Sequence, residues 1–114
     1  MPFLKIHTNQ SLDEATTKSV LEGASKITAE LLAKPERYVM VDLEAGRQML
    51  FDASVEPLAY LELKSIGLPT GQTTELSAAL AEFISTTLSI PKDRIYIEFT
   101  ETARHMWGWN GKTF

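Results

Sequence analysis

The sequence contains no cysteine among its 114 residues. Disulfide bonds, thiolate nucleophiles and cysteine-ligated zinc are therefore excluded. There are only two histidines, His7 and His105, and they lie at opposite ends of the chain without the spacing of a metal-binding motif. We expect no metal ion and no cofactor.

Long apolar runs and an excess of positive charge are also lacking. No apolar run approaches the roughly 20 residues needed to span a bilayer, and the N-terminus has no signal-peptide stretch. Lys and Arg number 11 against 15 Asp and Glu, which gives a net charge of −4 with no basic cluster. We expect a cytoplasmic protein that binds neither nucleic acid nor membrane. Release by another route stays open.

What remains is the composition of an ordinary globular domain. Hydrophobic residues make up 44% and charged residues 23% of the chain, both typical values. The length suits one domain, spanning residues 1–114, with a core of its own.

The first half of the chain predicts a strand, a helix and a second strand. Residues 2–8 alternate between apolar and polar, as in a half-buried strand, and Ser11 to Glu14 reads as a capping box. A helix is indicated by the apolar stripe that follows, made of Val20, Leu21, Ala24, Ile27, Leu31 and Leu32. Pro35 ends this helix. Residues 38–43 are nearly all apolar, which predicts a strand covered on both faces.

The second half repeats this plan. Residues 57–65 alternate as a strand, and Gly67, Pro69 and Gly71 mark a turn. A second helical stripe follows, made of Leu76, Ala79, Leu80, Phe83, Ile84 and Leu88. Residues 95–99 predict the last strand. The halves share residues at a constant spacing of 56, namely Pro35, Val39, Val41 and Asp42 with Pro91, Ile95, Ile97 and Glu98.

These patterns predict an α+β fold made of a duplicated βαβ unit. With right-handed crossovers, the units form a four-stranded mixed sheet with two helices on one face. The other face, with its apolar content and open edges, predicts partner subunits. The aromatic tail at 101–114 is expected to pack on the body or on a neighbour, with a tight turn at Asn110-Gly111.

Pro2 is the residue with the most distinctive chemistry. If Met1 is removed, which a small second residue permits, the chain begins with a secondary amine. All other backbone nitrogens are amides, so only this one can act as a base. Many proteins begin Met-Pro without a catalytic role, and the rest of the chain decides which reading holds.

Four other residues are candidate site residues. Lys34 follows a helix end, and the backbone N–H of Ile66, at a strand exit, can be free to bind an anion. Tyr96 and Glu98 are two apart on a strand and share a face. Three of them have a structural alternative: Lys34 as a solvated lysine, Tyr96 as a packing residue, and Glu98 as a solvated carboxylate.

Taken together, the chain resembles the macrophage migration inhibitory factor family, a branch of the tautomerase superfamily with an N-terminal proline. The resemblance runs from Met1-Pro2 to the terminal residues 108–114. Its most specific pieces are Pro2, Thr8-Asn9, Lys34-Pro35 with Tyr38, Glu56-Pro57, Ser65-Ile66-Gly67, residues 93–97 and Gly108-Trp109-Asn110. It implies a homotrimer of duplicated βαβ units with three sites at subunit interfaces.

The resemblance also implies roles for individual residues. Pro2 would be the general base of a keto–enol tautomerase that acts on phenylpyruvate-like or dopachrome-like compounds. Lys34 and the N–H of Ile66 would hold the substrate carboxylate or oxyanion. The pocket would be lined by Tyr96 of a neighbouring subunit and by Tyr38, Trp109 and Phe114. Apolar surroundings and Lys34 both disfavour an ammonium ion, and so would lower the pKa of the Pro2 amine toward a useful value.

The chain departs from the family pattern at three places. Glu98 stands where the family often has asparagine, and its carboxylate would repel an anionic substrate and raise the pKa of Pro2. Three alternatives stay open: Glu98 pairs with Lys34, it faces away, or it selects a less anionic substrate. Leu58 and Tyr60 stand where some members have Cys-x-x-Cys, so the thiol oxidoreductase activity attributed to those members is excluded. Trp107 is bulkier than is usual at its position and would narrow the pocket mouth.

Two other readings stay open beside the tautomerase. The chain could be a cytokine-like signalling or binding protein with a vestigial pocket, since some family members act through receptors. It could also be a purely structural trimer. The complete set of Pro2, Lys34 and Ile66 favours the enzyme, because a receptor ligand has no need of a basic amine in a pocket.

Overall fold

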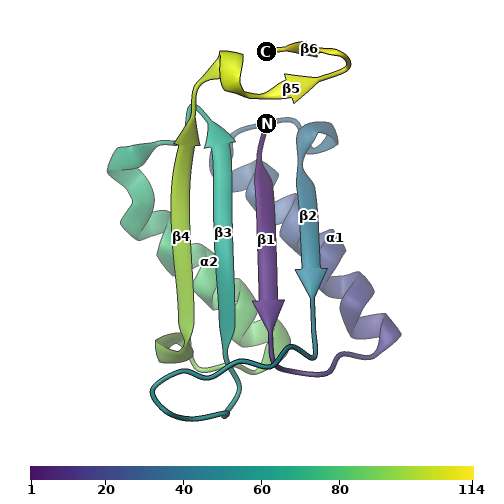
Figure 1. Ribbon diagram of the computed structural model, residues 1–114, viewed down its shortest axis with the longest axis vertical. Coiled ribbons are helices and arrows are strands. Elements are labelled where there is room, and N and C mark those ends of the chain that lie inside the picture. Colours follow the sequence, from purple (N-terminus) through teal and green to yellow (C-terminus); the bar gives the residue numbers. More distant parts are fainter.

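The fold consists of one four-stranded sheet with two helices packed against the same face (Figure 1). The computed structural model describes residues 1–114. In chain order the elements are β1 (Phe3–Thr8), α1 (Glu14–Leu32), β2 (Met40–Glu44), β3 (Ala59–Ile66), α2 (Thr73–Leu88), β4 (Ile95–Thr102), β5 (Gly108–Trp109) and β6 (Lys112–Thr113). Neither helix is long and apolar enough to cross a membrane.

The strand order β2-β1-β3-β4 confirms the predicted mixed sheet. β1 runs parallel to β2, and β3 runs parallel to β4, so each βαβ unit supplies one parallel pair. The units meet through the antiparallel pairing of β1 with β3 at the centre of the sheet. The α+β class expected from the sequence is therefore correct.

The internal duplication extends to the backbone between helix and strand. Ala33 and Ser89, which are 56 residues apart, end their helices in the left-handed conformation with φ of 52° and 56°. Each is followed by a proline and a single 3₁₀ turn, at Glu36–Tyr38 and Lys92–Arg94, that leads into the next strand. Both halves thus use the same exit from the helix, as the sequence spacing predicted.

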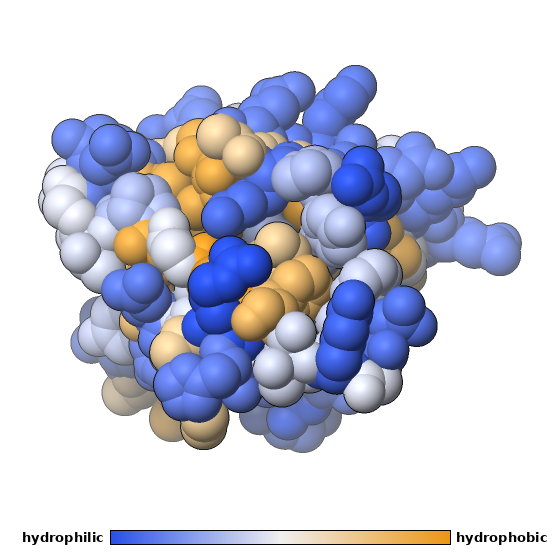
Figure 2. All heavy atoms as spheres, turned by 90° about the horizontal axis from the view of Figure 1, so that it is seen from above, coloured by the Kyte–Doolittle hydropathy of each residue, from blue (hydrophilic) through white to orange (hydrophobic).

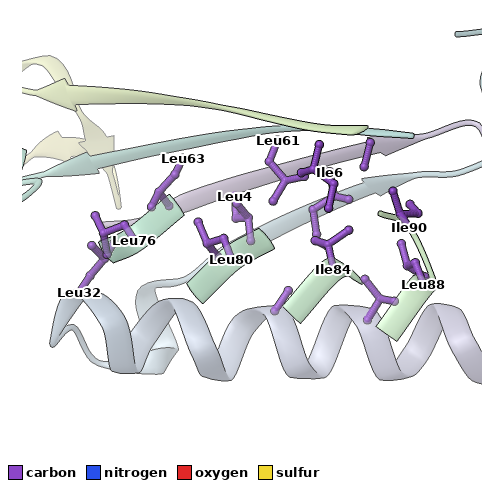
Figure 3. Packing of buried hydrophobic residues seen from close by; sticks show 14 of the residues in the cluster. Leu4, Ile6, Leu32, Leu61, Leu63, Leu76, Leu80, Ile84, Leu88 and Ile90 are labelled. Atoms are coloured by element: carbon purple, nitrogen blue, oxygen red, sulfur yellow. The ribbon is translucent and has the colours of Figure 1, made fainter. Parts of the chain in front are cut away.

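The core lies between the sheet and the two helices (Figure 3). Leu4 and Ile6 of β1 and Leu61 and Leu63 of β3 point toward the helices and are almost completely buried. From the helices, the sequence stripes supply Val20, Ala24 and Leu32 of α1 and Leu76, Leu80, Ile84 and Leu88 of α2. Burial on this scale is the main favourable term in folding.

The two helices approach each other closely at Gly23. A Cβ atom built at Gly23 would lie 2.8 Å from Cε1 of Phe83 on α2. The glycine therefore makes room for an aromatic ring between α1 and α2.

The cap of α1 differs from the sequence prediction. Asp13 is the N-cap, and its carboxylate accepts a hydrogen bond of 2.7 Å from the N–H of Thr16. This bond lowers the pKa of Asp13. Ser11 lies outside the helix, so the proposed capping box with Glu14 is wrong. Ser11 and Asp13 are both good N-cap types, so residue type does not decide between them. The helix begins at Glu14, which makes Asp13 the cap.

β2 also differs from expectation, because it is an edge strand of the protomer and is not covered on both faces. It begins at Met40, and residues 36–38 form the preceding turn. Its side chains alternate between exposed and half-buried, and Met40 is 66% exposed. An apolar run alone could not distinguish this edge from a central strand.

The face of the sheet opposite the helices is polar at its centre, and the apolar content expected from the sequence is limited to residues toward its ends, such as the exposed Met40 and Tyr96. Lys5 and Glu62 form an ion pair of 3.4 Å there. The Tyr60 hydroxyl lies 3.0 Å from Glu62 and 3.3 Å from Glu98, and partial burial together with these carboxylates raises the pKa of Tyr60 to about 12. The hydrogen bond that the Tyr60 hydroxyl donates to Glu62 lowers the pKa of Glu62. The alternation of the strands places charged residues on this face.

The loop between β2 and β3 is fastened by Arg94. The Arg94 guanidinium donates hydrogen bonds of 3.0 Å to four carbonyl oxygens, those of Phe51, Ser54, Glu56 and Pro57. Asn9 adds bonds to the carbonyl of Val55 and from the N–H of Leu58. Two segments that carry the family resemblance, Thr8-Asn9 and Asp93-Arg94, therefore supply the side chains that hold this one loop.

The C-terminal tail forms the short β5–β6 hairpin predicted from its turn residues. Asn110 and Gly111 have φ of 54° and 75°, and these positive values are what a tight two-residue hairpin turn requires. The hairpin lies across the end of the sheet at which β1 begins (Figure 1).

Candidate functional site

A cavity of about 280 Å³ lies where the hairpin meets the start of β1. Eight of its eleven lining residues are hydrophobic, and the lining consists of Met1, Pro2, Phe3, Arg37, Tyr38, Val39, Met40, Trp107, Gly108, Trp109 and Phe114. Figure 2 shows this end of the molecule, with apolar side chains between strongly hydrophilic ones. Its composition is that of a small-molecule site.

Pro2 forms part of the cavity wall and is itself fully buried. Its carbonyl oxygen accepts a hydrogen bond of 3.0 Å from the N–H of Met40. The parallel pairing of Phe3 with Met40 continues this contact into the sheet. The proline is thus positioned by β2 through its carbonyl, and its nitrogen needs no hydrogen bond to stay in place.

The amino group at the chain start lies in an environment that disfavours its charged form. In this structure the group belongs to Met1, which is half-buried in the cavity. Burial, reinforced by the cations of Lys34 and Arg104, lowers the pKa of this amine. A Pro2 amine exposed by loss of Met1 would lie among the same groups.

Lys34 reaches the turn that follows β3. The left-handed Ala33 ends α1, and the N–H of Lys34 returns to the carbonyl of Ala29 at 3.0 Å. The Lys34 ammonium lies 3.7 Å from the place where a Cβ of Gly67 would be. Since Gly67 directly follows the buried Ile66, the structure brings Lys34 and the Ile66-Gly67 segment together, beside the chain start.

Three aromatic rings form one wall of the cavity. Tyr38 packs edge-on against Trp109 and Phe114, with ring centroids 5.6 Å and 6.0 Å apart. Trp109 and Phe114 are stacked at 5.6 Å. The N–H of Phe114 also donates to the carbonyl of Trp107 at 3.2 Å, which closes the hairpin. The residues predicted as aromatic walls thus lie together, beside Pro2.

Tyr96 and Glu98 lie away from this cavity in the same chain. Tyr96 is in register with Tyr60, which is in register with His7, so Tyr96 is about 16 Å along the sheet from Pro2. It is 65% exposed and packs on Phe51, with ring centroids 4.6 Å apart. Glu98 shares its face and contacts Tyr60. Neither residue reaches Lys34 or Pro2 within the protomer.

Two arginines near the cavity were not identified as site residues from the sequence. Arg37 lines the cavity, and its guanidinium carbon lies 4.7 Å above the ring of Tyr38. Arg104 is close enough to the chain start to lower the pKa of the amine there. An arginine in a turn is usually solvated, so neither Arg37 nor Arg104 could be recognised from its own position in the sequence as a site residue. The only hint was their closeness in sequence to Tyr38 and Trp107.

The site therefore combines the buried Pro2, a nearby ammonium ion and an apolar, aromatic wall. No group of three or more His, Asp or Glu side chains is arranged to hold a metal ion. If Met1 is removed, the Pro2 amine in this set would be placed as a base for proton transfer on a small organic molecule. The fold and the site define the class: a small α+β protein of duplicated βαβ units, with its proline-bearing N-terminus in an aromatic pocket.

Comparison with known proteins identifies the family. The family model described as macrophage migration inhibitory factor (MIF) matches residues 1–114, and the chain belongs to this family. A curated macrophage migration inhibitory factor homolog of Brugia malayi is 36% identical, with 100% of this chain and 99% of that protein covered. The macrophage migration inhibitory factor of Xenopus tropicalis is 31% identical, at 100% and 99% coverage.

Solved structures agree with this assignment. The crystal structure of the macrophage migration inhibitory factor homologue from Prochlorococcus marinus is 42% identical, with a TM-score of 0.91 and 98% of both chains covered. The Trichinella spiralis structure is 33% identical, with a TM-score of 0.89, and covers 98% of this chain and 99% of that one. The resemblance found in the sequence is confirmed, and the tautomerase superfamily is consistent with it.

Proposed function

We propose that this protein is a keto–enol tautomerase in which the Pro2 amine, exposed by removal of Met1, is the general base. One observation carries the proposal: Pro2 is buried in the wall of an apolar cavity, where burial, Lys34 and Arg104 lower the pKa of an amino group. An ordinary alkyl amine is mostly protonated at neutral pH. A lowered pKa gives it the free electron pair that a base needs.

In the proposed reaction the Pro2 nitrogen moves a proton between the carbon next to a ketone and the ketone oxygen. An arylpyruvate-like acid suits the site, since its ring would lie against the wall of Tyr38, Trp109 and Phe114. Its carboxylate or enolate oxygen would be held by the Lys34 ammonium, which lies beside Gly67, and by the backbone N–H of the preceding residue, Ile66. Positioned donors of this kind stabilise the developing charge by a few kcal/mol each.

We further propose a homotrimer with three sites at subunit interfaces, in the cytoplasm. The supporting observation is the separation of Tyr96 from Pro2 along the sheet. Only another chain can bring Tyr96 to this pocket. The open edge of β2 and the exposed Tyr96, Met40 and Leu50 are consistent with contacts between subunits.

The test is phenylpyruvate tautomerisation by protein whose lack of Met1 is verified by intact-mass measurement. The substitution Pro2→Gly removes the secondary amine, and it should lower kcat/KM about 100-fold while circular dichroism remains that of the folded protein. A matched sample that retains Met1 should be inactive, because its Pro2 nitrogen is an amide. A Pro2→Gly protein as active as the wild type would contradict the proposal.

The alternative is a cytokine-like signalling protein with a vestigial pocket. It is favoured by the relatives, which are named macrophage migration inhibitory factors. Receptor binding that is unaffected by Pro2→Gly, together with no measurable turnover by wild-type protein, would support this alternative over the enzyme.

A further inference from the structure

The cavity has a charge opposite to that of the protein as a whole. The chain carries a net charge of −4, yet Arg37 is the one charged side chain that lines the cavity. Lys34 and Arg104 add two cations near the chain start. No Asp or Glu lines the cavity. Within the protomer, Glu98 lies on the open sheet face and contacts Tyr60.

Arg37 is held at the cavity wall without an acidic partner. Its guanidinium lies over the ring of Tyr38 at 4.7 Å, and one nitrogen donates to the Tyr38 hydroxyl at 3.4 Å. A cation over an aromatic face is stabilised by the ring's electron density. These two contacts fix the group in place and leave most of its five N–H donors free.

The other arginines with defined contacts are used differently. Arg47 pairs with Glu44, and Arg94 satisfies its donors with four backbone carbonyls. Arg37 forms no ion pair within the chain; the five that the structure contains involve other residues. A planar guanidinium with free donors at an apolar pocket is suited to binding a carboxylate with two hydrogen bonds.

We propose that Arg37 binds a second anionic group of the substrate, and that the preferred substrate class is an aryl-2-oxo acid with a carboxylate on its ring. This rests on the proposed tautomerase. The 2-oxo acid end would face Pro2 and Lys34, and the ring carboxylate would face Arg37. Arg37 is then a specificity-determining residue that acts on substrate choice.

The experiment measures binding, so that it does not depend on turnover. Phenylacetate and 4-carboxyphenylacetate, which differ only in the ring carboxylate, are titrated by isothermal calorimetry into protein lacking Met1. Wild-type protein should bind 4-carboxyphenylacetate about tenfold more tightly, as expected for one charge-assisted contact. Arg37→Met, which keeps the apolar stem, should abolish this preference, and Arg37→Lys should keep part of it.

Arg47→Met is the matched control, because Arg47 is an exposed arginine outside the cavity; it should retain the full tenfold preference. Equal affinity of wild-type protein for the two acids would overturn the inference, as would an unchanged preference in Arg37→Met. Either result leaves the Pro2→Gly test standing. Conversely, an active Pro2→Gly protein with an Arg37-dependent preference would reject the tautomerase and keep the dicarboxylate site.

Discussion

At the scale of single residues, the properties of the pocket depend on which groups surround the chain start. Lys34 is brought there by the left-handed Ala33, which ends α1 and turns the chain toward Gly67. Its charge and the burial of the site act in the same direction on a neighbouring amine. Lys34 therefore has two tasks in the proposed mechanism: it holds an anion and it keeps the base unprotonated.

The second task predicts a pH effect of Lys34→Gln in protein lacking Met1. Because the lysine cation lowers the pKa of the amine, its removal should raise that pKa. The unprotonated amine is the base, so the acidic limb of the kcat/KM profile should move to higher pH, with the largest loss of activity on the acidic side. The pH dependence of phenylpyruvate tautomerisation measures this shift.

Lys18→Gln is the control for that profile, since Lys18 is an exposed lysine on α1 that pairs with Glu22. Its acidic limb should coincide with that of wild-type protein. An acidic limb of Lys34→Gln at unchanged or lower pH would show that Lys34 does not tune the base.

The site residues were predictable from sequence to different degrees. Pro2, Lys34 and Ile66 could be named because they belong to the ordered set of residues that resembles the family. Arg37 could not, because its role comes from contact with Tyr38 and from the lack of an acidic partner, and both are properties of three-dimensional packing. The position of Glu98 beside Tyr60 depends on strand register, which sequence alone does not give.

At the scale of elements, the two βαβ units share the same backbone path from helix to strand. The loop that joins them, between β2 and β3, is held by hydrogen bonds from Arg94 of the second unit. The apolar stripes of the helices and the spacing of 56 residues predicted the units correctly. A helix that buries one face places its apolar residues at the helical repeat, and this repeat can be seen in the sequence. The loop between β2 and β3 could not be predicted. Its conformation depends on hydrogen bonds from Arg94, 37 to 43 residues away in sequence.

The contact between the helices predicts a destabilising effect of Gly23→Ala. The new methyl group would lie 2.8 Å from the Phe83 ring, and such overpacking costs about 1–3 kcal/mol. Alanine gains about 1 kcal/mol in helix propensity, so the net loss should be about 1 kcal/mol. Denaturant unfolding at a fixed protein concentration measures it.

A double mutant separates the two effects. In a Phe83→Leu background the ring is absent, so adding Gly23→Ala should raise the free energy of unfolding through propensity alone. If Gly23→Ala is equally destabilising in both backgrounds, the Phe83 contact is not the cause.

At the scale of the whole molecule, the protomer holds the parts of the proposed site at opposite ends of its sheet. Pro2 lies under the β5–β6 hairpin, and Tyr96 packs on Phe51 at the other end. Polar side chains occupy the centre of the open sheet face, so assembly would bury little apolar surface at that centre. Contacts at the strand edges and ends are the ones left for neighbouring subunits.

Shared sites can be tested by mixing two inactive proteins. Pro2→Gly and Tyr96→Ala should each have low activity alone. After they are unfolded together and refolded as a 1:1 mixture, about a quarter of the sites should combine an intact Pro2 with an intact Tyr96 from a neighbour. Recovered phenylpyruvate turnover measures these hybrid sites. Activity that never exceeds the average of the two parents would place each site within one chain.

The burial of Pro2 has a consequence for the order of methionine removal and folding. Once β1 has joined β2 and β3, the Met1–Pro2 peptide bond lies in the cavity wall, with Pro2 fully enclosed. A peptidase would reach that bond most readily while the N-terminus is still extended. Excision of methionine and closure of the sheet are then competing steps. If Met1 is removed during synthesis, the relative rates of these steps would fix the fraction of molecules that carry a free prolyl amine, and a molecule that folds first would keep Met1 until it unfolds.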